Sequence, residues 1–331
     1  MQDPKGKNKW GISNFIEVTS GIPQGSVIGP LLFLVYVNDL PINIKSSIRL
    51  FADDCILYRR IRNNEDREIM QRDLIFVEMF RGFPFSWFRD LILIEEWVAN
   101  NRMSRYIAFS NKRSPYCHSY CLNGKIIKNS DHCKYLGVTF DRNLNWEKQI
   151  NLIVAKAYKM LHYVMRNLRG SSRKAKEKGY LSLVRPIVEY ATTVWDPYHC
   201  GQVKKIEKIQ RKAARYVMGK FRKRDSVTEM LDTLRWDSLE KRRKISRLGC
   251  IYNIITSKDG WVPFKNSIVK PNFCGKDSHE FKIKPRRQRT DIKKYSFLNR
   301  GISEWNKLPV SLLRPLPKNV ISFKKKCSKI L

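Results

Sequence analysis

The sequence predicts an α+β fold, in which short antiparallel strands with packed helices come first and a mostly α-helical region follows. Two observations support this order. Short apolar runs bounded by turn residues occur before about residue 141, and they are typical of strands. From Trp146 onward, apolar residues recur at the spacing of an amphipathic helix, with basic residues on the opposite face. Hydrophobic residues make up 42% of the 331 residues, which is enough for a folded core.

Charge divides the chain in the same way. The formal net charge is +35, from 65 Lys and Arg against 30 Asp and Glu. Residues 1–140 carry 19 basic and 14 acidic residues, a net of +5, whereas residues 141–331 carry 46 and 16, a net of +30. Such a field most often binds nucleic acid, and an anionic membrane surface is the weaker alternative.

The sequence gives no sign of export or of membrane insertion. The first ten residues are polar, and the longest apolar run, Ile28–Val37, is about half of what a bilayer span needs. Eight cysteines in a chain of this length are too sparse for a disulfide framework. We therefore expect an intracellular protein, nuclear or cytoplasmic and not secreted, with no membrane and no defined protein partner.

The first part contains two features that matter for function. Residues 14–20 alternate as in a strand, residues 21–26 form a turn-rich break, and an apolar helix that should be buried begins at Val27. Two apolar runs within residues 48–60 then flank Asp53 and Asp54, which predicts a hairpin with two acids at its tip.

Helical patterns follow from Glu65 to about Met79 and over residues 91–103. The string Arg-Asp-Leu-Ile occurs at residues 72–75 and again at 89–92, and removing one copy with the residues between leaves one clean amphipathic helix. We interpret residues 76–92 as an insertion.

Strand-like pieces and then long helices complete the pattern. The strands are expected at 106–110, 119–122, 125–127 and 134–140, with Asn123-Gly124 as a strong hairpin signal. The helices are expected at 146–168, 173–195, 202–219 and 226–256, before a tail from about 260 that is richer in Pro, Gly and charge.

The adjacent carboxylates of Asp53 and Asp54 are the sharpest chemical feature. Two such charges on a tight hairpin repel each other, and a bound cation relieves that repulsion. Mg²⁺ prefers carboxylate oxygens and usually also contacts substrate phosphates, and two-metal phosphoryl transfer needs carboxylates arranged in this way. Alone, an Asp-Asp pair is more often a solvated turn.

The motif order resembles the palm of reverse transcriptases. The strings SGIPQGSVIGPLLFLVYVNDLP, LFADDCILY and CKYLGVTFDRNLNW are similar to those of jockey-type non-LTR retrotransposons, and so is SFLNRGISEWNKLP near the end. The resemblance covers about residues 11–331. It implies an RNA-directed DNA polymerase that performs two-metal nucleotidyl transfer on an RNA template and a DNA primer.

The resemblance also implies roles for particular residues. Asp53 and Asp54 match the paired catalytic aspartates that bind Mg²⁺ or Mn²⁺. The segment Pro23, Gln24, Gly25 and Ser26 matches a turn that lies against the nucleotide and template, and Tyr135, Leu136 and Gly137 match the hairpin that grips the primer. The implied domains are a partial palm at 11–141, a basic helical thumb and connection at 142–258, and a C-terminal basic region at 259–331.

One departure from the family pattern affects activity. The family has a first metal-binding aspartate on a strand well upstream of the Pro-Gln-Gly-Ser motif, and here only Asp3 precedes Ser20, in a polar segment. The fingers, the first half of the palm and the endonuclease are also lacking. We therefore expect weak metal binding and no polymerisation by this chain alone.

Two alternatives remain open. The helical half could be a non-catalytic, sequence-tolerant module that binds RNA or DNA. A group of cysteines and histidines could also bind zinc, although its spacing is looser than usual and ordinary thiols are the simpler interpretation. The members of this group are Cys117, His118, Cys121, His132 and Cys133.

Overall fold

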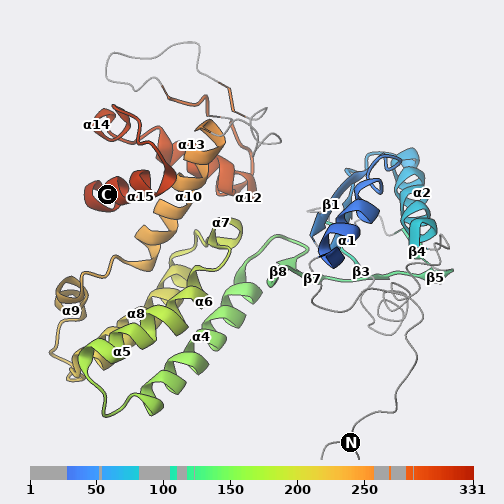
Figure 1. The fold of residues 1–331 in the computed structure, drawn as a ribbon. Helices are drawn as coiled ribbons and strands as arrows, with labels where there is room; N and C mark the ends of the chain where they lie inside the picture. The colour runs from blue at the N-terminus through green and yellow to red at the C-terminus, as the bar shows by residue number, and fades with distance from the viewer. Residues whose placement is uncertain are drawn as a thin grey trace, which may run out of the picture. The chain divides into compact units, whose positions relative to one another are not determined.

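The structure is a computed structural model that describes residues 28–51, 54–81, 105–109, 118–122, 124–256, 268–269, 281–285 and 287–331. The chain divides into two compact units, residues 1–131 and 132–331, and each is described by itself. Figure 1 shows the strands of the first unit and the helices of the second. The mixture of helices with small, mainly antiparallel sheets agrees with the expected α+β class.

The first unit contains the predicted acidic hairpin. Strands β1 (Ser47–Phe51) and β2 (Asp54–Tyr58) are antiparallel, with Ser47 opposite Tyr58 and Phe51 opposite Asp54. Helix α2 (Asn64–Arg81) lies against this hairpin, and a small core of Leu40, Ile48 and Val77 joins them.

A buried carboxylate attaches α2 to the chain that leads into the hairpin. Asp73, which is 4% exposed, accepts hydrogen bonds from the backbone N–H groups of Lys45 at 3.1 Å and Ser46 at 2.7 Å. The predicted helix over 65–79 is thus confirmed and runs to Arg81. It includes the first residues of the proposed insertion, and the remainder of that segment lies outside the described residues.

Helix α1 (Ile28–Asn38) confirms the helix predicted after the Pro-Gln-Gly turn. Its expected burial is not found, because Ile28, Leu31, Leu34 and Val35 are 60–64% exposed. The apolar character of this helix runs round its whole circumference, and the described residues of the first unit leave much of it uncovered.

The small strands of the first unit confirm the Asn-Gly hairpin. Strands β4 (Cys121–Leu122) and β5 (Lys125–Ile126) are antiparallel, and Gly124 takes a positive φ of 64° between them. The side-chain amide of Gln71 bonds both backbone groups of Cys121 at 2.9 Å, which attaches β4 to α2. Strands β3 (Arg105–Tyr106) and β6 (Lys128–Asn129) pair in parallel, so only the start of the strand expected at 106–110 is found.

The second unit opens with another hairpin. Strands β7 (His132–Tyr135) and β8 (Val138–Asp141) are antiparallel, with Tyr135 opposite Val138. The loop is therefore two residues long, and both take positive φ, 44° at Leu136 and 78° at Gly137. This conformation matches the twist of a hairpin and favours glycine at the second position.

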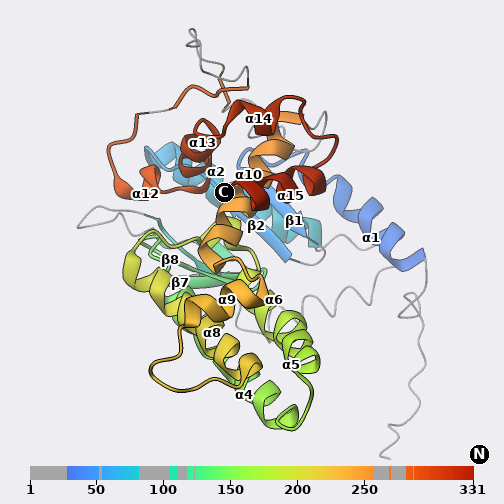
Figure 2. The same ribbon diagram turned by 90° about the vertical axis from the view of Figure 1, so that its left-hand side faces the viewer.

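A bundle of helices follows the hairpin. Helices α4 (Glu147–Asn167) and α8 (Cys200–Met218) lie side by side and parallel (Figures 1 and 2), and the chain returns between them through shorter segments. These are α5 (Arg173–Gly179), a π-helix (Tyr180–Val184), α6 (Arg185–Glu189) and α7 (Thr192–Trp195).

Two of the expected helices are broken for identifiable reasons. The stretch 173–195 widens into a π-helix just before Pro186, which has no N–H to donate, and it breaks again at Ala191, where φ is 51°. The stretch 226–256 divides at Arg235, where φ is 54°, into α9 (Val227–Leu234) and α10 (Leu239–Thr256). Residues with a left-handed backbone end helices.

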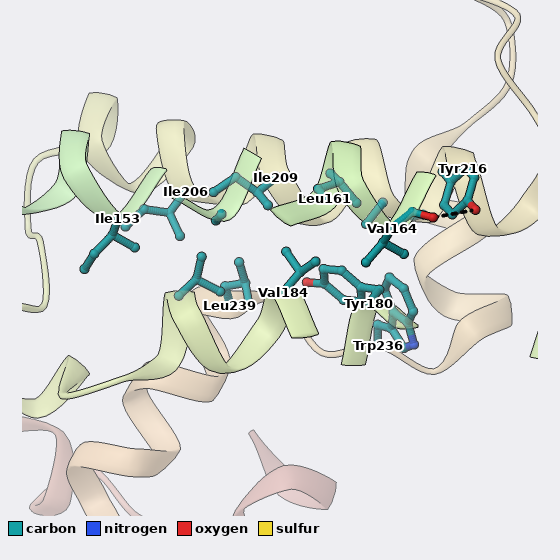
Figure 3. Packing of buried hydrophobic residues seen from close by; sticks show 14 of the residues in the cluster. Ile153, Leu161, Val164, Tyr180, Val184, Ile206, Ile209, Tyr216, Trp236 and Leu239 are labelled. Carbon is teal, nitrogen blue, oxygen red and sulfur yellow. Dashed lines mark hydrogen bonds between the residues drawn. The ribbon is translucent and has the colours of Figure 1, made fainter. Parts of the chain in front are cut away.

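A continuous apolar core fills the bundle (Figure 3). Ile153, Leu161 and Val164 from α4 face Ile206 and Ile209 from α8, and all five are at most 8% exposed. Tyr180 from the π-helix stacks on Trp236 with ring centres 4.5 Å apart, and its hydroxyl donates to Gln210 at 3.0 Å.

A second core joins α10 to the C-terminal helices, which are α12 (Asp291–Lys294), α13 (Phe297–Trp305), α14 (Val310–Leu313) and α15 (Val320–Ile330). Trp305 and Phe323 are fully buried there, next to Leu248 and Ile251 of α10. The indole N–H of Trp305 donates to the carbonyl of Phe281 at 2.9 Å.

The tryptophans of the second unit therefore serve packing, as expected, rather than exposed base stacking. Trp195 and Trp305 are 0% exposed and Trp236 is 9% exposed, while Trp261 lies outside the described residues. In the part of the chain that the structure describes, no helix combines the length and apolar character needed to cross a bilayer. The domain boundaries expected at 141 and 258 stay predictions.

Candidate nucleic-acid interface

The β1–β2 hairpin closes between Phe51 and Asp54. Asp54 is the first residue of β2 and pairs with Phe51, and Ala52 and Asp53 come between these two residues in the sequence. The backbone thus forms the hairpin that the sequence predicted. Asp53 and the side chain of Asp54 lie outside what the structure describes, as do Pro23, Gln24, Gly25 and Ser26.

The tip of the β7–β8 hairpin is fixed to the bundle by Tyr190. The hydroxyl of Tyr190 donates to the carbonyl of Leu136 at 2.7 Å, across 54 positions of sequence. Its ring also lies 3.3 Å from the point that a Cβ at Gly137 would occupy. Glycine is therefore favoured at position 137 for two reasons. Its φ is positive, and the Tyr190 ring leaves little room for a Cβ.

A second contact fixes strand β8 two residues after the turn of the same hairpin. The backbone N–H of Thr139 donates to the side-chain oxygen of Gln149 at 2.8 Å, and Gln149 is 2% exposed. The indole N–H of Trp195 donates to the carbonyl of Tyr190 at 2.7 Å. Tyr135, Leu136 and Gly137, which the sequence singled out together, are thus brought together on one rigid turn.

A polar seam runs along the surface where α4 and α8 meet. The ammonium of Lys205 lies 3.3 Å from Oδ1 of Asn151, and that of Lys212 lies 2.7 Å from Nε2 of His162. Lys212 also lies over the ring of Tyr158, 5.5 Å from its centre. Lysine beside an aromatic ring and a neutral donor or acceptor is a chemistry that suits phosphate and ribose contacts.

Further basic residues of these two helices are exposed. In the part of the chain that the structure describes, none of them forms an ion pair with a carboxylate, apart from the long contact of 4.0 Å between Lys205 and Glu147. The exposed basic side chains on α4 and α8 are Lys148, Lys156, Lys159, Arg166, Lys204, Lys205, Lys208 and Arg211. We call this set together with the seam the α4–α8 surface.

An ion-pair network between α7 and the C-terminal helices was not foreseen from the sequence. The Asp196 carboxylate accepts from Nε of Arg243 at 2.8 Å, from Nη1 of Arg247, and lies 3.0 Å from Nη1 of Arg300. Glu304 bonds Arg247 through both of its oxygens, at 2.9 and 2.6 Å. The signal that could have revealed it is the i, i+4 spacing of Arg243 with Arg247 and of Arg300 with Glu304.

Burial makes this network costly to disturb. The side chains of Arg243 and Arg247 are 1% and 2% exposed, and that of Asp196 is 9% exposed. Burial alone disfavours the charged form of Arg247, but the hydrogen bonds of Glu304 and the charge of Asp196 outweigh it and raise the pKa of Arg247. Nη1 and Nη2 of Arg243 have no hydrogen-bond partner among the described residues.

The described residues hold no cluster of three His, Cys, Asp or Glu side chains suited to a metal ion. Of the possible zinc ligands, His118, Cys121, His132 and Cys133 are described and Cys117 is not. Burial raises the pKa of the Cys133 thiol, which works against the thiolate that zinc requires. The carboxylates of Asp53 and Asp54 have the oxygen chemistry that Mg²⁺ prefers, so the donor set fits that ion.

Known proteins that resemble this chain are polymerases. The chain is 29% identical over 217 residues to a probable RNA-directed DNA polymerase from transposon X-element of Drosophila melanogaster. The aligned part covers 63% of this chain and 23% of that protein. The chain is 24% identical over 271 residues to the RNA-directed DNA polymerase from mobile element jockey of the same fly, with 77% and 28% covered. No family model matches the chain, and neither does any solved structure.

These homologues are RNA-directed DNA polymerases as a class. More narrowly, they come from jockey and related non-LTR transposons, and a third example, from transposon BS of Drosophila melanogaster, is 27% identical over 60% of this chain. The resemblance stated from the motifs is therefore confirmed. The chain spans about a quarter of the length of these relatives, from 22% to 28%.

Proposed function

We propose that this chain is part of the RNA-directed DNA polymerase of a non-LTR retrotransposon. The observation that carries the proposal is the joint presence of the acidic β1–β2 hairpin and the anchored β7–β8 turn in a chain whose homologues are such polymerases. Each hairpin contains a motif to which the resemblance assigns a functional role. The activity, template and primer of the whole protein belong to this proposal.

In this proposal the acidic hairpin is the metal site. Asp53 and Asp54 would hold Mg²⁺ or Mn²⁺, and the bound ion would supply charge stabilisation for nucleotidyl transfer. The turn at Pro23, Gln24, Gly25 and Ser26 contacts the incoming nucleotide and the template. The proposed partial palm, residues 11–141, would then comprise most of the first unit together with the β7–β8 hairpin that opens the second.

The anchored turn is the primer contact in the same proposal. A primer end needs a rigid surface, because misplacement of the reacting hydroxyl by about 1 Å lowers the rate steeply. Tyr135, Leu136 and Gly137 supply such a surface, since Tyr190 fixes the tip of the hairpin and Gln149 fixes strand β8 just after the turn.

The helical bundle binds the template–primer duplex by its phosphates. The α4–α8 surface offers lysines and arginines along two parallel helices, and residues 141–331 have a net charge of +30. Phosphate contacts supply affinity without sequence preference, which suits an enzyme that must move along its template. The bundle is the proposed thumb and connection, residues 142–258, and residues 259–331 are the basic C-terminal region.

A non-catalytic module that binds RNA or DNA is the second candidate. The observation that favours it is that the positive charge lies almost wholly in the second unit, whose two cores fold round helices without the acidic hairpin. Such a module would bind duplexes with steep salt dependence and with no need for Asp53.

Primer extension tests whether this chain polymerises on its own. The 331-residue chain is assayed on an RNA template annealed to a DNA primer, with Mg²⁺ or Mn²⁺, beside Asp53→Ala. We expect no incorporation by this chain alone, since it spans about a quarter of its relatives. Incorporation that disappears in Asp53→Ala would contradict this expectation and establish the metal site directly.

Duplex binding tests the role of the bundle. An RNA–DNA duplex should bind with a steep dependence of log affinity on log salt concentration, by about 0.9 for each neutralised phosphate. Lys205→Gln with Lys212→Gln should lower that slope by about 2 and weaken binding to all sequences alike. A slope unchanged in this double variant would remove the α4–α8 surface from the proposal.

A further inference from the structure

Three aromatic rings form a column at the surface beside the ion-pair network. Tyr198, which follows α7, stacks on Tyr295 at the end of α12 with ring centres 4.2 Å apart and planes 5° from parallel. The ring of His199 lies 4.1 Å from that of Tyr198, tilted by 36°. Two rings cannot both come this close on one face without overlapping, so His199 and Tyr295 cover opposite faces of Tyr198.

The column ends in solvent on one side and in a cation on the other. His199 is exposed, and Tyr198 and Tyr295 are partly exposed. The ammonium of Lys294 lies over the ring of Tyr295, 5.2 Å from its centre. Among the described residues, no apolar core contains either tyrosine.

Basic residues surround this column. Lys293 and Lys294 are exposed on α12, and Arg287 and Arg289 are exposed just before it. Residues 287–300 contain one acid, Asp291, against five basic side chains. The segment that supplies Tyr295 is thus strongly positive and open to solvent.

The surrounding fold fixes the column in place. Tyr198 follows Asp196 and Pro197, and Arg300 contacts both, through the carboxylate at 3.0 Å and the carbonyl of Pro197 at 3.2 Å. The loop after α7 and the turn after α12 are therefore tied together by the same buried network. The stack is a consequence of rigid neighbours and not of two loose side chains meeting.

We propose that the Tyr198–Tyr295 column is a stacking site for unpaired nucleotides of a single-stranded nucleic acid. An unpaired base stacks on the face of Tyr295 that Lys294 covers, in place of the Lys294 ammonium, and Lys293 and Lys294 bind the phosphates next to it. Aromatic faces beside a basic groove are the general means of binding single strands, because every base has a π face. Bases inside a duplex hide these faces, so this site discriminates against duplex.

This inference rests on the proposed function for its partner, nucleic acid, but it concerns another surface. The α4–α8 surface binds a duplex through phosphates alone. The column binds bases, and it is built from the C-terminal region and the loop before α8. The two surfaces can therefore be separated by substitution.

The experiment compares single-stranded and duplex ligands. A 12-nucleotide RNA without self-complementarity, the DNA of the same sequence, and an RNA–DNA duplex are titrated against the full 331-residue chain by fluorescence anisotropy. Tyr295→Ala should weaken single-strand binding by roughly 5- to 100-fold and leave duplex binding within about twofold. Tyr295→Phe should bind as the wild type does, because it keeps the ring.

The matched control is Phe221→Ala. Phe221 is 62% exposed and is followed by Arg222, Lys223 and Arg224, but no ring stacks on it among the described residues. Its loss should change single-strand binding by less than about twofold. An equal loss of single-strand affinity in Phe221→Ala and Tyr295→Ala would show that any exposed aromatic residue among basic residues suffices. This result would contradict the proposed stacking site.

A second readout guards against misfolding of the variants. 2-Aminopurine placed in the single strand is quenched when it stacks on an aromatic ring, so the wild type and Tyr295→Phe should quench it and Tyr295→Ala should not. Unquenched 2-aminopurine in a bound strand of the wild type would refute the column. Single-strand binding that Tyr295→Ala leaves unchanged, beside steep salt-dependent duplex binding, would refute the column alone. No binding of any ligand would refute the proposed function as well. RNA and DNA strands that bind equally identify a site without a 2′-hydroxyl contact, and preferential RNA binding adds such a contact.

Discussion

Substitution of Asp196 by asparagine should destabilise the second unit severely. Asp196 accepts from Arg243 and Arg247 and lies 3.0 Å from Arg300, while Glu304 is the other acid of the network. Three positive charges thus meet two negative ones, and Asp196→Asn leaves three against one. Removing one partner of a buried ion pair costs about 3–5 kcal/mol, because the remaining charge stays buried.

Substitution of Arg243 by methionine should have a much smaller effect. Nη1 and Nη2 of Arg243 are buried without a hydrogen-bond partner among the described residues, and each such group costs about 1–3 kcal/mol. Methionine removes this cost and the excess charge, and it loses only the bond from Nε to Asp196. We expect Arg243→Met to change the free energy of unfolding by less than about 1 kcal/mol, in either direction.

Urea unfolding followed by tryptophan fluorescence measures both variants, since Trp195 and Trp305 report on the two cores beside the network. The control is Glu147→Gln, which removes a surface pair of 4.0 Å and should cost less than about 1 kcal/mol. A cost for Asp196→Asn no larger than that of the control would refute the buried network as a source of stability. A loss of several kcal/mol in Arg243→Met would instead refute the inference that the unpaired nitrogens of Arg243 offset its contribution to stability.

Three further predictions concern the second unit. Gly137→Ala should destabilise the β7–β8 hairpin by about 1–2 kcal/mol, because φ is positive there and a Cβ would lie 3.3 Å from the Tyr190 ring, and amide hydrogen exchange of the hairpin should reveal it. Cys327 is fully buried with its pKa raised to about 11, so it should react with iodoacetamide at pH 8 on the order of 100-fold more slowly than the exposed Cys200, measured by peptide mass spectrometry. Burial tends to raise the pKa of Asp237, but hydrogen bonds from Lys241 of α10 and Ser328 of α15 lower it overall. Asp237→Asn should therefore cost about 1 kcal/mol at neutral pH, and this cost should shrink as the pH falls below the ordinary carboxyl pKa of 3.8 and through the lowered one. A cost that stays constant over this fall in pH in urea titrations would contradict the prediction.

The periodicity of the sequence predicted the long helices well where one face is apolar. Helices α4 and α8 begin and end within about two residues of expectation, because local amphipathic pattern and burial agree along their whole length. The breaks at Pro186 and Arg235 were not predicted. A proline in a helical pattern and a left-handed residue are both compatible with several local structures, and tertiary packing decides between them.

The candidate sites were predictable to the extent that they are local. The β7–β8 turn interrupts the single strand expected at 134–140, and only the resemblance implied a hairpin there. Its anchor at Tyr190 lies 54 residues away and leaves no local signal. The Tyr198–Tyr295 column was missed for the same reason, since its two rings come from segments almost a hundred residues apart. The roles of Asp53, Asp54 and residues 23–26 stay predictions.

The hydrogen bonds of Tyr190 have a mechanical consequence. Its hydroxyl bonds the hairpin tip and its carbonyl accepts from Trp195, so two bonds connect the tip to a fully buried indole. A load applied to the tip, such as a bound strand under tension, is therefore transmitted to the interior of the bundle rather than absorbed by a loose loop. The fluorescence emission of Trp195 would then report on a force that a bound ligand applies at Leu136.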